Sequence, residues 1–402
     1  MKKIKTKIRL TDEDLYYLNT VNEYGIMPHR LVHYLYEGLS YEQAFRRVNR
    51  RMANQHELLV VGRFIETTRK LSKKYYTLSP KGYNLLCERT KEMANEPMPY
   101  NMRGLHAVST LERRYDISET ACLVRGSGYG ILRRDIGCKL PLTEEELNNM
   151  PRYPAPDTGE YFIPNHLLKR LPQFSHSNSS MTGLLVQGDQ NFATYNFTRK
   201  QSIIWRTSIE VAQSYSKFEG QDMTGLILFY DSSNPTLEQM LDNRNKAINS
   251  NNRHNTAPTG LMRYLSPDEL PCKHRYLVPD NETGRFILGE CIRKNINNID
   301  LMDKVLGESE GAQFRANAKK YTGIHGLDSN AHIHQIYLVP DHTDLQRLKS
   351  FSLLNQIPPS KIHVYCLESE IDYVEQYMGF EPGQLQITYM TLENMKQLFS
   401  GE

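Results

Sequence analysis

The segment from Ser40 to Asn54 constrains this chain most, because its apolar and basic residues recur with the period of a helix. At about 100° per residue, the apolar side chains gather on one stripe and the basic and amide side chains on the opposite one. The apolar stripe consists of Tyr41, Phe45, Val48 and Met52, and the polar stripe of Gln43, Arg46, Arg47, Arg50 and Asn54. A helix with two such faces packs on one side and leaves a cationic side open to a polyanion.

The polar stripe carries side chains that match the edges of DNA bases. Arg forms paired hydrogen bonds with guanine, Asn and Gln form them with adenine, and Arg also pairs with phosphates. Ser40 and Gln43 form a capping box that starts this helix, and Thr11 and Asp14 form another at an earlier helix that ends at Gly25. The alternative is a charged face that is merely solvated. We predict a DNA recognition helix with contacts from Gln43, Arg46, Arg47, Arg50, Arg51 and Asn54.

The residues around this helix predict a helix-turn-helix core followed by a β-hairpin. Pro28 opens a short helix that ends at Gly38. The apolar run 58–61 and the run 75–78 flank a basic stretch, which is the pattern of a hairpin with a cationic tip. Such a wing contacts the phosphate backbone. Its predicted contact residues are Arg69, Lys70, Lys73 and Lys74.

Charge is distributed unevenly along the chain. Residues 1–91 hold 18 Lys and Arg but 9 Asp and Glu, whereas all 402 residues together have a net charge of only +3. The remainder is therefore net acidic. A basic module joined to an acidic body is typical of a polyanion-binding domain attached to a domain with another role.

Composition and periodicity divide the chain into three parts and predict an α+β multidomain fold. An N-terminal winged helix-turn-helix, the DNA-binding domain, covers residues 1–91. A connecting helical and basic segment with a Pro-rich linker covers 92–160, with a helix over 105–115 and a strand over 122–124. An α/β domain with a mixed sheet covers 161–402. Its expected strands are 182–187, 192–197, 224–230, 276–279, 334–340 and 361–367, and its expected helices are 208–218, 236–248 and 343–351.

Composition also argues against a membrane protein, a disulfide framework and a structural metal. No apolar run approaches the roughly 18 residues that a membrane span requires, and no apolar segment follows the charged N-terminus as in a secretion signal. The six cysteines are scattered, with no Cys-x-x-Cys pair. We expect a cytoplasmic protein with reduced thiols, no metal and no cofactor.

A metal-dependent nuclease needs carboxylates that converge on a metal near a lysine, commonly as Pro-Asp followed by Asp/Glu-x-Lys. Pro279-Asp280 is followed by Glu290, but Ile292 stands where the lysine belongs. Pro340-Asp341 has no Asp/Glu-x-Lys soon after it, and the pair Asp189 and Glu210 also lacks the lysine. The residues therefore argue against an active nuclease of this type.

A second catalytic pattern is His332-Ile333-His334, which resembles the paired-histidine strand of relaxases and rolling-circle initiators. In those enzymes the histidines hold a metal so that a tyrosine can attack the DNA phosphate. Here Tyr373 or Tyr377 would be the nucleophile and His325 or His342 a third ligand. Chance produces such a pair often in a chain with 13 histidines. Histidines on an ordinary strand are the favoured interpretation.

The run Tyr76-Thr77-Leu78-Ser79-Pro80-Lys81-Gly82 is similar to an ending common in bacterial winged-helix proteins. Together with a following helix near His106 and an α/β C-terminal part, it makes the chain resemble the replication-relaxation family of plasmids and conjugative elements. The resemblance lies in residues 8–90 and, beyond residue 160, in architecture alone. It implies DNA binding in plasmid replication, transfer or their control. It also implies a nuclease-like second domain, which the missing Glu-x-Lys makes degenerate and non-catalytic here.

The leading hypothesis is a sequence-specific double-stranded DNA-binding protein of a mobile element, acting as an accessory factor or regulator at a transfer or replication origin. Its acidic body would contact a relaxase, another replication or transfer protein, or a second copy of the chain. One alternative is a metal-dependent DNA-nicking or DNA-cleaving enzyme that uses the second domain. Another is a transcriptional repressor whose second domain senses a ligand.

Overall fold

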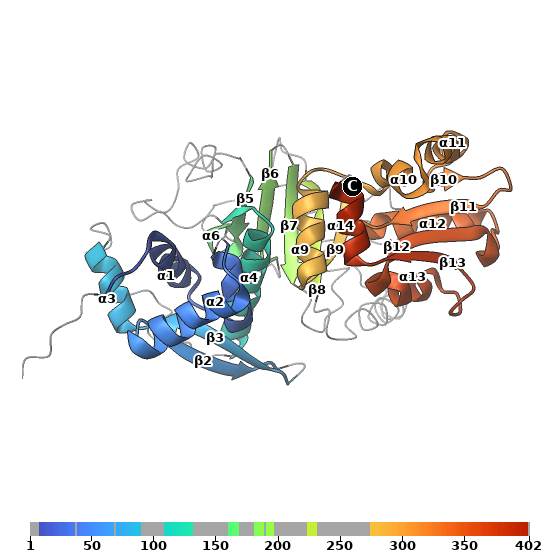
Figure 1. Ribbon diagram of the computed structural model, residues 1–402. Coiled ribbons are helices and arrows are strands. Elements are labelled where there is room, and N and C mark those ends of the chain that lie inside the picture. The colour runs from blue at the N-terminus through green and yellow to red at the C-terminus, as the bar shows by residue number, and fades with distance from the viewer. Residues whose placement is uncertain are drawn as a thin grey trace, which may run out of the picture. The chain divides into compact units, whose positions relative to one another are not determined.

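The computed structural model describes residues 8–36, 38–67, 70–89, 108–131, 160–168, 181–188, 190–196, 223–230 and 274–400. The chain separates into two compact units, Met1–Asp189 and Gln190–Glu402, each of which combines helices with strands (Figure 1). The expectation of a mixed α+β fold is therefore confirmed. The division between the units lies further along the chain than the Pro-rich stretch near residue 154.

Within the described ranges, no helix of either unit combines the length and apolar character that crossing a membrane requires.

Unit 1 begins with the helices that the two capping boxes predict. At each box, the side chain of Thr11 or Ser40 accepts a hydrogen bond from the backbone amide three residues later. The side chain of Asp14 or Gln43 in turn accepts one from the backbone amide of Thr11 or Ser40. The first helix ends at Gly25, whose φ of 84° favours glycine. The elements are α1 (Asp12–Tyr24), β1 (Met27–Pro28), the 3₁₀ helix η1 (His29–Leu35), α2 (Tyr41–Phe45) and its π-type continuation η2 (Arg46–Gln55).

A three-stranded antiparallel sheet follows, with strand order β1-β3-β2. The hairpin strands β2 (Leu59–Ile65) and β3 (Ser72–Leu78) pair so that Leu59 lies opposite Leu78 and Ile65 opposite Ser72. The predicted hairpin is confirmed, but Lys73 and Lys74 lie within a strand and not at its tip. The sheet leads into α3 (Pro80–Arg89).

Helix α4 (Val108–Gly126) packs on these N-terminal elements and belongs to the same unit. Ser118 Oγ donates to the carbonyl of Ile26 at 2.6 Å, and buried Glu119 pairs with Arg30. The strand predicted over 122–124 is wrong, because these residues continue the helix. A short apolar run is compatible with a buried strand or a buried helix, so its periodicity could not decide.

The last elements of unit 1 are short strands and one helical turn. β4 (Gly130–Ile131) runs parallel to β5 (Glu160–Pro164), which pairs antiparallel with β6 (Gly183–Gln187). Between β5 and β6, α6 (Asn165–Leu168) lies against α1, since His166 Nε2 is 2.9 Å from Glu23 Oε1.

Unit 2 starts with three parallel strands, β7 (Gln190–Asn196), β8 (Met223–Tyr230) and β9 (His274–Pro279). Their positions confirm the strands expected at 192–197, 224–230 and 276–279. The helices expected over 208–218 and 236–248 lie outside the described residues. After β9 come α9 (Glu282–Phe286), η8 (Ile287–Ile292), α10 (Asn298–Leu306) and α11 (Glu308–Ala318).

A mixed four-stranded sheet completes unit 2, with order β10-β11-β12-β13. β10 (Gly326–Leu327) is antiparallel to β11 (Ile333–Tyr337), whereas β11, β12 (Ile362–Leu367) and β13 (Gln386–Met390) run parallel, side by side in Figure 1. Parallel neighbours require crossover connections, which the intervening helices supply. These helices are α12 (His342–Leu354), η9 (Pro359–Lys361), η10 (Glu368–Glu370) and α13 (Ile371–Met378), and α14 (Leu392–Ser400) follows β13.

Candidate nucleic-acid interface

The α2–η2 helix buries one face at a spacing of four residues. Ala44, Val48 and Met52 have no exposed surface, whereas Tyr41 is 44% exposed. The helix ends with a wide turn in which the His56 amide donates to the Arg51 carbonyl five residues earlier. Val48 and Met52 are therefore the packing residues that the sequence predicted, but Tyr41 is not.

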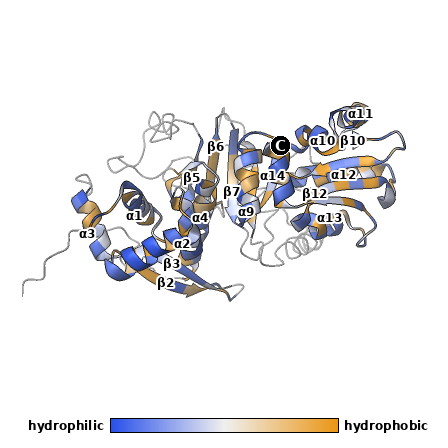
Figure 2. Ribbon diagram, in the orientation of Figure 1, coloured by the Kyte–Doolittle hydropathy of each residue, from blue (hydrophilic) through white to orange (hydrophobic). Residues whose placement is uncertain are grey.

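The opposite face of this helix is open to solvent. Gln43, Arg46, Arg50 and Asn54 are all exposed, and Figure 2 colours this helix largely hydrophilic. Arg46 pairs with Glu42 at 3.3 Å, and both side chains are more than half exposed, so the pair is weak and easily exchanged for another anion. Within the described residues, Arg50 forms no ion pair. The structure thus brings four of the predicted contact residues onto one accessible face.

Arg47 turns away from this face and fastens the helix to α1. Its guanidinium donates to Asp14 Oδ1 at 2.6 Å and to Glu13 Oε2 at 3.1 Å, and it lies 5.3 Å above the Tyr36 ring. Only 19% of the Arg47 side chain is exposed, and Asp14 is fully buried. The predicted base contact of Arg47 is therefore replaced by a structural role, because the acidic capping box of α1 attracts the guanidinium.

Arg51 is also turned toward the N-terminal segment, where its guanidinium donates to the carbonyl of Arg9. It lies one helical turn beyond Arg47 and is half-buried. Its predicted DNA contact is likewise replaced by a contact within the module.

The basic residues of the hairpin divide in the same way. Lys73 is 9% exposed, and its Nζ lies 5.5 Å from the centre of the Tyr115 ring of α4, so it does not reach solvent as predicted. Lys74 and Lys70 are exposed, and Lys70 adopts a left-handed φ of 59° in the turn. Arg69 lies outside the described residues. Of the predicted hairpin contacts, Lys70 and Lys74 are thus the described residues that face solvent.

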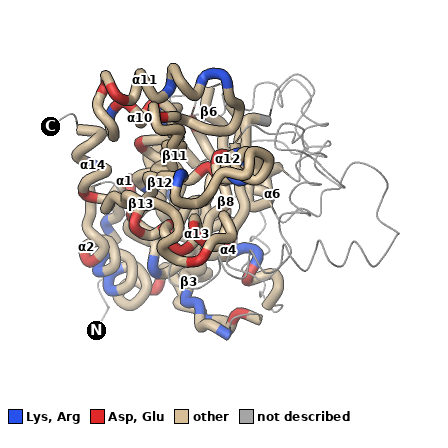
Figure 3. Tube along the Cα trace, turned by 90° about the vertical axis from the view of Figure 1, so that its right-hand side faces the viewer, with Lys and Arg blue, Asp and Glu red and all other residues tan. Residues whose placement is uncertain are grey.

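Arg63 is a basic residue of the hairpin that the sequence reading missed. It is exposed and lies directly opposite Lys74 in the antiparallel ladder. Like charges opposite each other repel, so an anion that binds both relieves this repulsion. The pairing register alone brings these two residues together. Figure 3 shows basic positions along both the α2 helix and the β3 hairpin.

The helix and the hairpin meet at a seam formed by His29, Phe45, Asn49 and Tyr76. The Tyr76 hydroxyl donates to Asn49 Oδ1 at 3.3 Å, and the His29 ring stacks on the Tyr76 ring with centroids 4.9 Å apart. The Phe45 ring meets His29 edge-on at 5.0 Å. Burial and the nearby Lys74 ammonium lower the pKa of His29 below its ordinary value. The seam therefore holds the exposed helix face and the exposed strand β3 in a set geometry.

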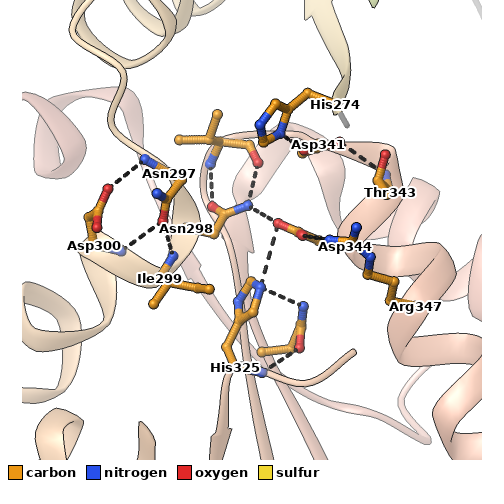
Figure 4. A network of polar contacts seen from close by, with 12 residues as sticks. His274, Asn297, Asn298, Ile299, Asp300, His325, Asp341, Thr343, Asp344 and Arg347 are labelled. Carbon is orange, nitrogen blue, oxygen red and sulfur yellow. Dashed lines mark hydrogen bonds and ion pairs between the residues drawn. The ribbon is translucent and has the colours of Figure 1, made fainter. Parts of the chain in front are cut away.

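In unit 2, Asp341 is committed to hydrogen bonds that stabilise the fold (Figure 4). Its Oδ1 accepts from the amides of Thr343 at 3.0 Å and Arg275 at 2.9 Å, and its Oδ2 lies 2.8 Å from His274 Nδ1. The carboxylate caps α12 and joins it to β9. Its Pro-Asp sequence therefore has a structural use that needs no metal.

Next to it, Asp344 belongs to a polar network that joins α12, α10 and His325, the residue before β10 (Figure 4). Asn298 Nδ2 donates to Asp344 Oδ2 at 2.8 Å, and His325 Nε2 lies 3.6 Å from the same oxygen. Burial opposes ionisation of Asp344, but His325 and Asn298 outweigh it and keep the pKa of Asp344 below its ordinary value. The His325 ring thus faces the Asp344 carboxylate.

The paired histidines both face Asp328. His332 Nδ1 lies 3.1 Å and His334 Nε2 lies 3.6 Å from Asp328 Oδ2, and His334 Nδ1 lies 3.1 Å from the Tyr365 hydroxyl. Burial lowers the pKa of His334, although Asp328 favours its charged form. In the part of the chain that the structure describes, no three His, Cys, Asp or Glu side chains are arranged to hold a metal ion. Asp189 and Glu210 lie outside that part.

The tyrosines of the relaxase hypothesis lie in a different cluster. The Tyr373 hydroxyl is 2.5 Å from His342 Nδ1, and the Tyr377 ring packs edge-on against His342 at 4.5 Å. In the same cluster, buried Glu370 accepts from the Tyr230 hydroxyl at 2.6 Å, and burial raises the pKa of Glu370 to about 7. The structure therefore places His332 and His334 beside Asp328, and Tyr373 and Tyr377 in another group with His342.

No protein-family model, curated protein or solved structure matches the chain. The function is therefore inferred from the chemistry of the exposed residues of unit 1 and from the resemblance in residues 8–90.

Proposed function

We propose that unit 1 carries a winged helix that binds double-stranded DNA with sequence preference. The observation that carries this proposal is the exposed face of the α2–η2 helix, which combines Gln43, Arg46, Arg50 and Asn54 beside a basic strand. The order α1, β1, η1, α2–η2, β2, β3, with its three-stranded sheet, supports the winged-helix assignment. The resemblance to the replication-relaxation family supports a role as an accessory factor or regulator at a transfer or replication origin.

The exposed residues have distinct proposed roles. Arg50, Asn54 and Gln43 contact base edges, where forked donors and acceptors discriminate between base pairs. Arg63, Lys70 and Lys74 contact phosphates, which position the duplex without reading its sequence. Arg46 exchanges its exposed partner Glu42 for a phosphate or a guanine. Arg47, Arg51 and Lys73 act within the protein, for the reasons given above.

Unit 2 is proposed to act without catalysis, as the surface that contacts a relaxase, another replication or transfer protein, or a second copy of the chain. Asp341, His334 and Tyr373 each form hydrogen bonds within unit 2, and one ring nitrogen of His325 faces Asp344. These partners support a structural use of the residues that a nicking enzyme would need.

A footprint of the full-length protein on the intergenic DNA beside its own gene tests the proposal. The reaction contains Mg²⁺ and Mn²⁺ and is scored for protection and for strand breaks. We expect protection without breaks, its loss in the double variant Arg50→Ala/Asn54→Ala, and its retention in the control Lys320→Ala, an exposed residue of unit 2. A site at an origin or at a promoter separates the accessory and regulatory roles. A specific nick would overturn the non-catalytic assignment.

A further inference from the structure

One histidine at the candidate interface, His29, differs from several histidines elsewhere in the chain that lie beside a carboxylate. His166, His274 and His332 each lie within 3.1 Å of a carboxylate oxygen. Among the described residues, neither ring nitrogen of His29 has a hydrogen-bond partner, and its ring is only half-buried. His29 therefore has polar atoms available at a place where the Lys74 ammonium acts on its ring.

The surroundings of His29 fit an anion. Its ring is clamped between Tyr76 on β3 and Phe45 on α2, which fixes its plane at the seam. Lys74, one of the proposed phosphate contacts, is close enough to act on its charge. Arg46 follows Phe45 on the helix and is exposed. A phosphate held by Lys74 at this seam would approach a ring that is already in position.

We propose that His29 is a further phosphate contact of this interface and that it takes up a proton when DNA binds. This inference rests on the proposed function and adds a residue and a regulatory property to it. The cationic imidazolium donates to the phosphate through a ring nitrogen, and both nitrogens of the charged ring carry hydrogen. DNA binding therefore becomes stronger as pH falls.

The sign follows from linkage between proton binding and DNA binding. In the free protein, burial and Lys74 lower the pKa of His29, so its ring is neutral near pH 7. A bound phosphate favours the charged ring and neutralises Lys74, so it raises the pKa of His29. Between high and low pH, the affinity for DNA then rises by up to about tenfold for each unit by which bound DNA raises this pKa.

Tyr76 and Arg30, two ionisable residues near His29, are not expected to produce the same effect. The pKa of Tyr76, against which His29 stacks, is raised far above neutrality by burial and by Tyr41. Arg30, the next residue along η1, pairs with buried Glu119. His33, on the same helix, packs against Tyr41 and Tyr34, and it serves as a second site to be tested.

His56 offers a matched control. It belongs to the same module and directly follows η2, and burial together with Arg51 and Lys81 lowers its pKa as well. Unlike His29, it does not lie between the helix and the hairpin. If proximity to cations alone caused the pH dependence, His56 would contribute equally.

The test measures the dissociation constant of the full-length protein for its footprinted duplex from pH 5.5 to pH 8.5, at constant ionic strength. Proton uptake is measured by calorimetry in two buffers of different ionisation enthalpy. The variants are His29→Phe, which keeps the ring stack without a charge, His29→Gln, His33→Gln and His56→Gln. We expect wild type to bind at least several-fold more tightly at pH 6 than at pH 8, with uptake of up to one proton. Both His29 variants should lose that dependence, and both control variants should retain it.

Several outcomes overturn the inference while leaving DNA binding intact. These are pH-independent binding by wild type, an unchanged pH profile in His29→Phe, or loss of the pH dependence in His33→Gln or His56→Gln instead. Failure of the proposed function looks different, because the wild-type protein would then show no specific duplex binding at any pH. Thermal unfolding of each variant separates a lost contact from a lost fold.

Discussion

The two units place their ionisable residues in opposite environments. In unit 1, Arg50, Arg63 and Lys74 face solvent without ion pairs among the described residues. In unit 2, His325, His334 and Asp344 lie inside hydrogen-bonded groups. An exposed cation retains its capacity to bind an external anion, whereas a buried charge must be satisfied within the fold or it costs stability. Accessibility, more than residue type, therefore distinguishes the proposed DNA interface from the polar networks of unit 2.

Arg47 breaks this division inside unit 1, and its removal should have the largest effect. Arg47→Ala leaves Asp14 buried without its charged partner, so we expect a loss of about 3 kcal/mol in the free energy of unfolding. Urea unfolding of the full-length protein measures this loss. The salt dependence of DNA binding by the folded variant should be unchanged, since Arg47 makes no phosphate contact. A smaller slope of log affinity against log salt, with unchanged stability, would show that Arg47 contacts DNA.

In unit 2, buried Glu370 allows the stability cost of an ionised buried carboxyl to be measured. Its folded pKa of about 7 lies above the ordinary value of 4.5, so ionisation destabilises the fold. The penalty is absent below about pH 4.5, grows between pH 4.5 and 7, and is complete above about pH 7, where it reaches about 3 kcal/mol.

The substitution Glu370→Gln removes this ionisation. We expect the variant to be more stable than wild type at pH 8 and not at pH 5, measured by urea unfolding and by hydrogen exchange in α13. Glu368→Gln, an exposed neighbour in the same turn, is the control and should behave as wild type at both pH values. Equal responses of the two variants would show that burial of Glu370 is not the cause.

Arg50 sharpens the comparison from the accessible side. Arg50→Ala removes an exposed side chain, so the free energy of unfolding should change by less than about 0.5 kcal/mol. Specific DNA binding should weaken by about 1 to 3 kcal/mol and lose discrimination at one base pair. Competition gel shifts with single-base variants of the footprinted site measure both effects. Uniform weakening across all sequences would instead make Arg50 a phosphate contact.

The neighbours Lys73 and Lys74 give the smallest effects but the closest matched pair. Lys74→Ala should reduce the slope of log affinity against log salt by about 1 without changing stability. Lys73→Ala removes its contact with the Tyr115 ring and should cost about 0.5 to 1 kcal/mol of stability while leaving the slope unchanged. Salt titrations and thermal unfolding of both variants check the pair. A reversal of the two results would contradict the orientations of these side chains.

Local patterns predicted much of the backbone because their causes are local. The boxes at Thr11 and Ser40, the end at Gly25 and the strands of the hairpin each depend on residues a few positions apart. The apolar run at 122–124 was assigned wrongly, because it continues α4, which packs through Ser118 and Glu119 on Ile26 and Arg30, far away in the sequence.

The sequence by itself determined that a capped, two-faced basic helix precedes a basic hairpin, and that strands alternate with helices in the second half. Only the tertiary structure decided which cations reach solvent. Arg47 and Arg50 belong to the same stripe of the helix, yet Asp14 of α1 binds one and leaves the other free for an external anion. The reason is that a charge binds whichever opposite charge the fold brings within a few ångströms, and sequence spacing cannot specify a partner 33 residues away.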